Sequence, residues 1–265
     1  MSLDGDRSQR APQPAWWWLP RAHAIAYAIF ALVFAASWIN PIWPSAEALH
    51  HSLTVIGVAL LIWASRRFEL PLSSLVCALI FLTLHSIAAH WLYSYVPYDH
   101  WTENVFGFSL NTEMGWRRNN FDRLVHFSYG MLLVPIVTTW LTKRRGWRAG
   151  PAAYAAVTTV LASGAVYEIF EWAVAVIAAP GMAEAYNGQQ GDFFDSDKDM
   201  AIAALGAMIS AAILLITAAV RHIRRAEPAL PLPSPLPLPS PPPLPSPPPL
   251  PSALPAPGGV VQVGR

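Results

Sequence analysis

Residues 119 to 141 read NNFDRLVHFSYGMLLVPIVTTWL, an apolar run typical of membrane-spanning helices that begins with three charged or titratable side chains. These are Asp122, Arg123 and His126. Charged groups in the hydrocarbon layer are costly enough that they usually face a partner, a cavity or a functional site. The stretch therefore predicts a transmembrane helix with a polar site near its N-terminal end.

The composition of the chain is that of a membrane protein. Of its 265 residues, 54% are hydrophobic and 12% are charged, whereas about a quarter of the residues in soluble domains are charged. Most of its apolar segments approach the roughly 20 residues that a helix needs to span the hydrocarbon layer. We predict an all-α membrane bundle of six transmembrane helices, at about 22 to 39, 49 to 65, 71 to 91, 121 to 142, 151 to 178 and 198 to 220.

The basic residues predict the orientation of these helices. They gather before the first apolar segment, between the second and third, between the fourth and fifth, and after the sixth. Lys and Arg favour the cytoplasmic side, so both termini are expected there, with the connections 92 to 120 and 179 to 197 outside. Residues 1 to 21 form a cytoplasmic arm and residues 22 to 222 the membrane domain. The first apolar segment has features of a cleavable signal, but we interpret it as a retained span.

The C-terminal segment, residues 226 to 265, differs from the rest in composition. From Glu227 onward it holds 16 of the 26 prolines. Because proline lacks the amide that helices and sheets need, we predict a disordered or polyproline II cytoplasmic tail. Its PxxP spacings permit a cytoplasmic polyproline-binding partner, but we favour the interpretation as a low-complexity tail without a dedicated partner. Membrane lipids are the expected surroundings, and no motif for nucleic-acid binding is present.

Titratable residues of four predicted spans lie toward the same leaflet. With the orientation above, the two histidines of the third span, the Asp and His of the fourth, the two glutamates of the fifth and the aspartates before the sixth all fall at the outer side. Within three of these groups the spacing is three or four residues, which places each pair on one helix face. The residues concerned are His85, His90, Asp122, His126, Glu168, Glu171, Asp192, Asp195, Asp197 and Asp199.

Imidazole and carboxylate groups gathered in this way are typical ligands of zinc, manganese or iron. The spacing of five between the two histidines of the third span predicts that only one joins the site. Glu168 is a candidate general base, and Arg123 can hold a phosphate or carboxylate near the surface, because it points partly away from Asp122. The candidate metal ligands are His85, His90, Asp122, His126, Glu171, Asp195 and Asp199.

Each of these residues also has a structural explanation. Asp197 and Asp199 fit helix caps, Arg123 fits a residue that snorkels to headgroups, and the span-three histidines can bond backbone carbonyls. Glu168 and Glu171 are harder to explain in this way. Two carboxylates one turn apart repel each other unless a proton, a cation or a basic partner lies between them.

Four blocks of the sequence together resemble a known family. LHSIAAHWLYSYVP, NNFDRLVHFSYG, YEIFEW and QQGDFFDSDKDM, in this order, are similar to blocks of the YjdF-like inner-membrane proteins of bacteria. The resemblance covers about residues 22 to 222 and implies a multi-pass inner-membrane protein without an assigned reaction. The family's polar positions would correspond here to His85, Tyr93, Tyr95, Asn120, Asp122, Arg123, His126, Gly130, Glu168, Glu171, Gly191, Asp192, Asp195 and Asp199.

Three functions fit these observations. The leading hypothesis is a metal-dependent hydrolase or transferase that acts on a lipid or envelope substrate at the outer leaflet. The second is a proton- or cation-coupled transporter in which the glutamates and His126 exchange protons. The third is a non-catalytic scaffold whose polar network fixes helix packing.

Overall fold

A computed structural model describes residues 19 to 177 and 188 to 226. This part of the chain is helical, without strands. The short helices α4 and α5 lie within the connection 92 to 120, where the sequence did not predict helices. The helices are α1 (Arg21–Ser37), α2 (Pro44–Phe68), α3 (Leu72–His90), α4 (Tyr98–Phe106), α5 (Leu110–Met114), α6 (Phe121–Arg145), α7 (Ala149–Ile177) and α9 (Asp195–Ala226).

Five of these helices, α2, α3, α6, α7 and α9, are long and apolar enough to cross a membrane. The first predicted span corresponds to α1, which has 17 residues and is therefore roughly 26 Å long. The second span is longer than predicted, because Pro44 starts α2 five residues before the apolar run begins. Its first turns carry Glu47, His50 and His51, of which only Glu47 lies outside the predicted span.

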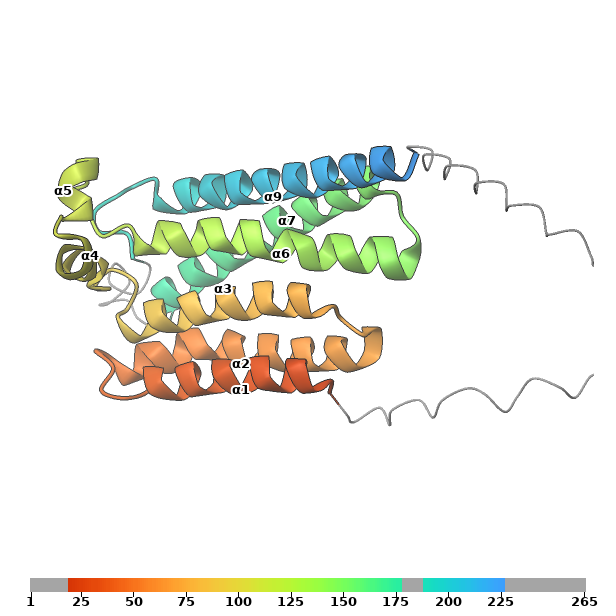
Figure 1. Ribbon diagram of the computed structural model, residues 1–265. Coiled ribbons are helices and arrows are strands. Elements are labelled where there is room, and N and C mark those ends of the chain that lie inside the picture. The colour runs from red at the N-terminus through yellow and green to blue at the C-terminus, as the bar shows by residue number, and fades with distance from the viewer. Residues whose placement is uncertain (1–18, 178–187, 227–265) are drawn as a thin grey trace, which may run out of the picture. The chain divides into compact units, whose positions relative to one another are not determined.

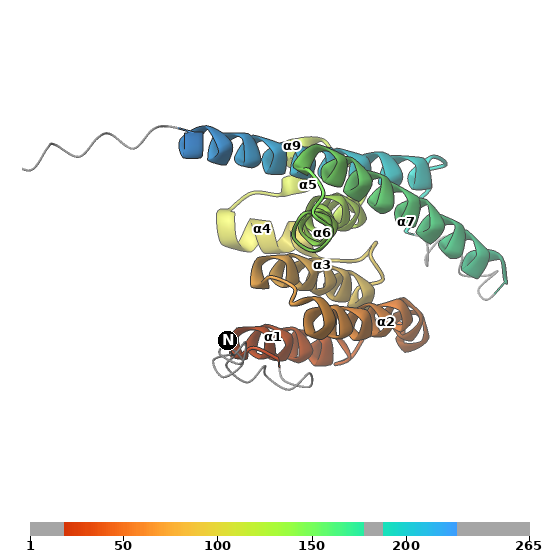
Figure 2. The same ribbon diagram turned by 90° about the vertical axis from the view of Figure 1, so that its right-hand side faces the viewer.

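The long helices alternate in direction along the sequence (Figure 1). Helix α3 packs against α1, α2 and α6, and α6 also packs against α7 and α9. Figure 2 shows α7 crossing this array at an angle, so that its C-terminal end swings toward α2. At that end Ala46 and Leu49 of α2 share an apolar cluster with Phe170 and Val174 of α7. The α4 and α5 helices lie at this same end, which is called the α4 end below.

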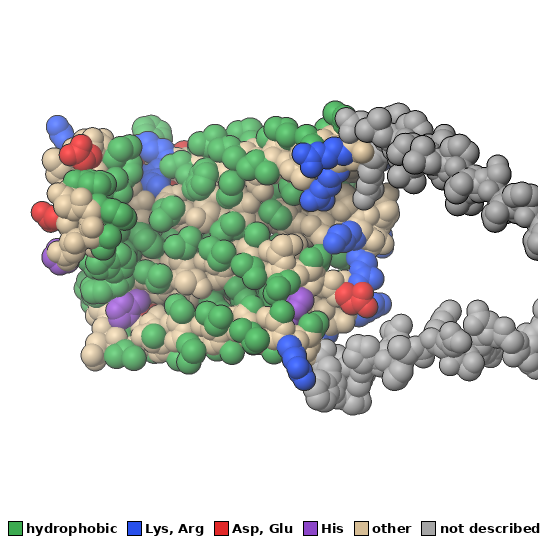
Figure 3. Space-filling model, in the orientation of Figure 1, with side chains coloured by type: hydrophobic (Ala, Val, Ile, Leu, Met, Phe, Trp, Pro, Cys, Tyr) green, Lys and Arg blue, Asp and Glu red, His purple; other side chains and the backbone are tan. Residues whose placement is uncertain are grey.

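The side chains on the outside of the helices are largely apolar. Leu32, Leu60, Ile169, Trp172 and Ile216 are all more than half exposed. In the view of Figure 3, hydrophobic side chains cover the flanks of the bundle, while Lys and Arg gather at the end opposite α4. A soluble protein rarely exposes so much contiguous apolar surface, and the hydrocarbon layer is its natural solvent.

Helices α6 and α9 approach each other closely at two glycines. A Cβ atom at Gly130 would lie 1.9 Å from the carbonyl oxygen of Ala203, and one at Gly206 would lie 2.3 Å from that of Phe127. Both are shorter than any real contact, so only glycine permits this approach. Small residues allow helix backbones to meet in this way in membranes, where apolar surface gains little from leaving lipid.

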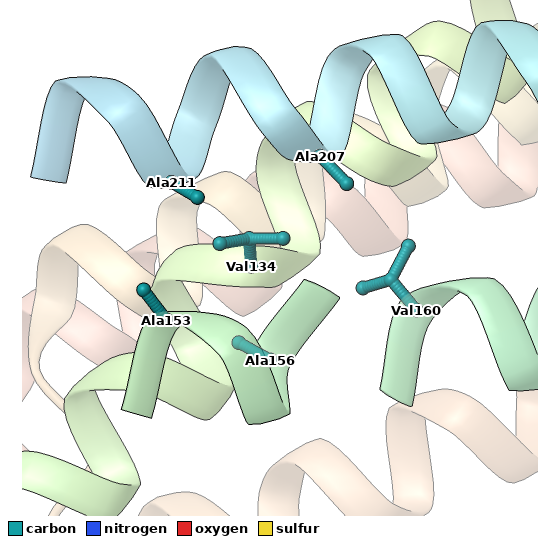
Figure 4. Packing of buried hydrophobic residues seen from close by; sticks show 6 residues of the cluster. All are labelled: Val134, Ala153, Ala156, Val160, Ala207 and Ala211. Carbon is teal, nitrogen blue, oxygen red and sulfur yellow. The ribbon is translucent and has the colours of Figure 1, made fainter. Parts of the chain in front are cut away.

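A packed apolar layer extends from this contact toward the end opposite α4. Figure 4 shows Val134 of α6 facing α7 and α9, whose alanines and Val160 surround it. All six residues are buried, and Val134 is fully so. The layer seals the space between the three helices. Its members are Val134, Ala153, Ala156, Val160, Ala207 and Ala211.

The predicted N-terminal arm and proline-rich tail fall almost entirely outside the described residues, as do residues 178 to 187 of the connection between α7 and α9.

Replacing Gly130 or Gly206 by alanine is expected to destabilise the protein, because the added methyl group meets backbone atoms that cannot turn aside. Overpacking typically costs about 1 to 3 kcal/mol, and we expect the upper end of this range. Thermal unfolding of the purified protein in detergent measures the effect. Gly150→Ala in α7 is the control, since its Cβ would have no heavy atom within 4 Å. Equal melting temperatures for all three variants would contradict a role for the glycine contact.

Candidate polar and metal site

Arg118 organises the polar site at the α4 end. It lies just before α6, and its guanidinium pairs with the carboxylates of Asp122 and Asp195, the latter at 2.5 Å. It also donates to the backbone carbonyls of Gly188 at 3.1 Å and Gln189 at 3.4 Å. Arg118 therefore ties the start of α6 to the start of α9 and to the loop before it. Arg118 was not among the predicted site residues, although its spacing of four from Asp122 is a usable signal.

Arg123 lies in the same network. Its guanidinium pairs with Asp195 and lies 3.2 Å from Asp192, while its Nε lies 3.3 Å from Asp199. Only 11% of its side chain is exposed. The expectation that Arg123 points away toward headgroups was wrong, because three aspartates of the α9 segment lie against this side of α6. Arg123 thus holds these carboxylates in place rather than reaching the surface.

His126 lies one turn after Asp122 along α6 and faces a different set of partners. Its Nδ1 lies 3.8 Å from Oε1 of Glu168 on α7. Ligand atoms of His126, Glu168 and Asp199 all lie within 4.8 Å of one another, as do those of Asp122, Asp195 and Asp199. The second group is occupied by the two guanidinium groups. The first group has one imidazole and two carboxylates, and of the two guanidinium groups only that of Arg123 is paired with it, through Nε, which makes it the candidate metal centre.

The charges of this site do not balance. Six acids converge from α6, α7, α9 and the segment before α9, against three basic residues, Arg118, Arg123 and Lys198. Lys198 binds Asp192 at 2.6 Å and holds the pKa of that carboxyl below its usual value. An excess of buried carboxylates requires protons or a cation for compensation. The acids are Asp122, Asp192, Asp195, Asp199, Glu168 and Glu171.

The two histidines of α3 do not enter the metal group. Nδ1 of His90 donates to the carbonyl of Ser37 at 2.6 Å, so this ring joins α3 to α1. His85 is buried, with Nε2 lying 3.4 Å from the carbonyl of His50 and Nδ1 bonded to the Tyr93 hydroxyl. Since a carbonyl can only accept, Nε2 carries the proton and Nδ1 accepts from the tyrosine. His85 therefore polarises Tyr93.

The turn after α3 is shaped for this contact. Leu92 and Tyr93 have φ of 47° and 56°, in the left-handed region that side chains other than glycine rarely adopt. Two successive residues there cost roughly 1 to 2 kcal/mol each. Backbone bonds from Leu92 to Ala89 and from Tyr93 to Ala88 hold the turn. Such strain is common where a functional side chain must be aimed.

A further buried polar group lies on α2, and the sequence analysis missed it. Glu47 is fully buried, and His51 Nε2 lies 3.3 Å from its carboxylate and 3.1 Å from the Ser37 hydroxyl. Nδ1 of His51 faces Thr54 at 3.4 Å. The i, i+4, i+7 spacing of Glu47, His51 and Thr54 within a membrane helix was the available signal.

The other predicted residues are placed as follows. Glu171 is half-buried one turn from Glu168 on the same face of α7. Asp197 is exposed in the first turn of α9, outside the network. Asn120 precedes α6, and its backbone amide donates to the Tyr98 hydroxyl at 3.0 Å. Burial raises the pKa of Tyr98.

A cavity of about 420 Å³ lies between α2, α3, α6 and α7. Near the α4 end its lining includes polar and aromatic side chains together with Leu53 and Val125, whereas farther along α2, α3 and α6 the lining is mainly apolar. His126 lines the cavity and also belongs to the candidate metal group, so the two lie next to each other. The lining residues at the polar end are Thr54, His85, Tyr93, His126 and Tyr167.

Comparison with known proteins identifies the family. Residues 22 to 219 match the family described as "Predicted membrane protein (DUF2238)", and the chain belongs to it. The inner membrane protein YjdF of Escherichia coli (strain K12) is 32% identical over 174 residues, which cover 64% of this chain and 78% of the relative. No solved structure matches the chain. The protein is a multi-pass inner-membrane protein.

Arg118→Gln is expected to destabilise the folded state by about 3 kcal/mol, because removing one member of a buried ion-pair network leaves uncompensated carboxylates. Arg117→Gln is the matched control, since Arg117 is the neighbouring residue and is exposed. Thermal unfolding in detergent at low salt compares the two. If both variants had the same melting temperature as the unaltered protein, the ion-pair network would not contribute to stability as proposed.

Proposed function

We propose that this protein is a membrane-embedded, metal-dependent hydrolase or transferase that acts on a lipid or other envelope substrate at the outer leaflet. The observation that carries the proposal is the convergence of His126, Glu168 and Asp199 from three helices. They lie inside a site with more acids than bases, and one of them, His126, also lines the cavity. Neutral imidazole and carboxylate oxygens suit zinc, manganese or iron.

The donor atoms fit a metal in number and spacing. Three protein ligands are typical of catalytic zinc, which keeps a further position for water or substrate. Separations within 4.8 Å need only a small contraction to meet ligand bonds of about 2 Å. Oδ1 of Asp199 is buried and makes no hydrogen bond among the described residues, and its ion pair with Nε of Arg123 at 3.3 Å leaves a lone pair for a metal.

The surrounding residues then have distinct roles. A bound metal would lower the pKa of its water and polarise a carbonyl or phosphoryl oxygen. Glu168, first considered as a base, takes a ligand position, and Glu171 one turn away becomes the general base. Arg123 would orient the Asp199 carboxylate through its Nε, which lies 3.3 Å from Oδ1. Arg118 fixes Asp122 and Asp195 and thereby the start of α9.

The packed layer favours an enzyme over a transporter. Val134, Val160 and Ala207 each lie eight positions along their helices from His126, Glu168 and Asp199. Eight residues of helix amount to about 12 Å. Apolar side chains therefore close the three-helix space directly beneath the metal group. A transported ion would need this layer to open, whereas a reaction confined to one leaflet does not.

The proposal includes six crossings with both termini in the cytoplasm. Helix α1 starts and α9 ends at the same end of the bundle, opposite α4 (Figure 1), where the basic side chains gather (Figure 3). This arrangement supports a cytoplasmic location of that end. The metal group then faces the outer leaflet.

A periplasm-active reporter fused after Arg225 is expected to be inactive, and a cytoplasm-active reporter at the same position active. Fusion into the loop at Gly107, between α4 and α5, should give the reverse result. Enzyme assays on whole cells measure both. Periplasmic activity of the Arg225 fusion would overturn the orientation.

Purified protein is expected to carry close to one equivalent of a transition metal, which His126→Ala should reduce at least tenfold by removing the single nitrogen ligand. Elemental analysis after dialysis against a weak chelator provides the measurement. His100→Ala is the control, because His100 is exposed on α4 and contacts only Asn104. If unaltered protein binds no metal even after incubation with zinc or manganese, a protonated network replaces the metal centre and the enzyme proposal loses its basis.

A further inference from the structure

We infer that the cavity between α2, α3, α6 and α7 binds one hydrocarbon chain of an amphiphilic membrane lipid, with the lipid's polar group at the His85 and His126 end. The inference deepens the proposed function, on which the assignment of this lipid as the substrate rests. The binding of the chain itself follows from the shape, the polarity and the surroundings of the cavity.

The polarity of the cavity changes along its length in the same direction on α2, α3 and α6. On α2 it passes from Thr54 to Leu60 and Leu61, and on α6 from His126 to Ile136 and Val137. The distance from His126 to Val137 is roughly 16 Å along the helix. A polar end followed by a long apolar length matches an amphiphile with an extended chain.

The polar groups in the middle of the cavity are already satisfied. The Tyr129 hydroxyl and the Ser163 hydroxyl, which both line it, bond each other at 2.5 Å. The inner part is walled by apolar side chains, which bind water poorly. An empty space of this size would forfeit dispersion contacts on all sides. A hydrocarbon chain restores these contacts without needing any hydrogen bond.

The surroundings supply the occupant. Helices α2 and α7 touch near the α4 end through Ala46 and Val174, and α7 diverges from α2 toward its other end (Figure 2). The neighbouring outward residues, such as Val55 and Ile169, are exposed and apolar, as expected for contact with lipid. A chain can therefore enter sideways between α2 and α7. Its ester or phosphoester then lies beside His126 and Tyr93.

Gly57 allows a sharp test. It lines the cavity, and a Cβ atom there would have nothing within 4 Å, so a larger side chain fills the cavity without moving the backbone. Gly164 offers the same opportunity on α7, where a Cβ would make an ordinary 3.8 Å contact with Tyr129. Gly150 is the control, since it also has open space but lies outside the cavity.

The full-length protein is reconstituted in nanodiscs with phosphatidylethanolamine that carries a diazirine near the methyl end of one acyl chain, then irradiated and mapped by peptide mass spectrometry. Labelling is expected at the inner cavity residues Leu61, Ile136 and Val137. Gly57→Leu and Gly164→Leu should reduce it at least tenfold, and Gly150→Leu should leave it unchanged. Labelling of lipid-facing Ile216 is the internal standard, and melting temperature reports folding.

Unchanged labelling of the cavity residues in both filled variants, or labelling of lipid-facing residues alone, would overturn the inference. His126→Ala separates it from the proposed function. If that variant loses the metal but keeps cavity labelling, both proposals stand. Cavity labelling in a protein that never binds metal would retain the lipid site and reject the enzyme.

Discussion

The contact between the backbones of α6 and α9 is the constraint on which the site depends. The two helices run in the same direction (Figure 1), and residues that meet across them differ by 73 in number, repeating every four residues. Asp122 meets Asp195, His126 meets Asp199, Gly130 meets Ala203, and Val134 meets Ala207. Gly130, in the third of these pairs, brings the helices close together. The side chains of the first two pairs, Asp122 with Asp195 and His126 with Asp199, can therefore converge. The same close approach packs Val134 against Ala207 in the apolar layer.

Convergence of so many carboxylates is stable only with compensation, and the protein supplies it in two ways. Near the surface, Arg118 and Arg123 interleave with Asp122, Asp192 and Asp195. Guanidinium groups suit this task because they bridge several oxygens at once. One turn deeper, His126, Glu168 and Asp199 have Nε of Arg123 at their edge. A metal there would offset the remaining negative charge. Asp199 belongs both to this group and to the group with Asp122 and Asp195, so it lies between the metal position and the guanidinium groups.

Local patterns in the sequence were sufficient for the long helices and for most members of the acidic site. Hydropathy located the spans, and pairs spaced by three or four identified the faces of α6, α7 and α9. What they could not supply was the direction of long side chains between helices. Arg123 turns inward because α9 lies against it, and His90 bonds α1 instead of joining the site. The start of α2 was missed because Glu47 and the residues before it lie outside the apolar run that defined the predicted span.

The cavity connects these polar groups into one arrangement. On one wall, His126 belongs to the candidate metal group. On the other, a strained turn aims Tyr93 at His85, and His51 stands behind Thr54 with buried Glu47 as its partner. The apolar part of the cavity extends from these polar groups between α2, α3, α6 and α7. A lipid that enters from the membrane would therefore place its headgroup end between His126 on one wall and Tyr93 on the other, where the Tyr93 hydroxyl, which donates to His85, could accept a hydrogen bond.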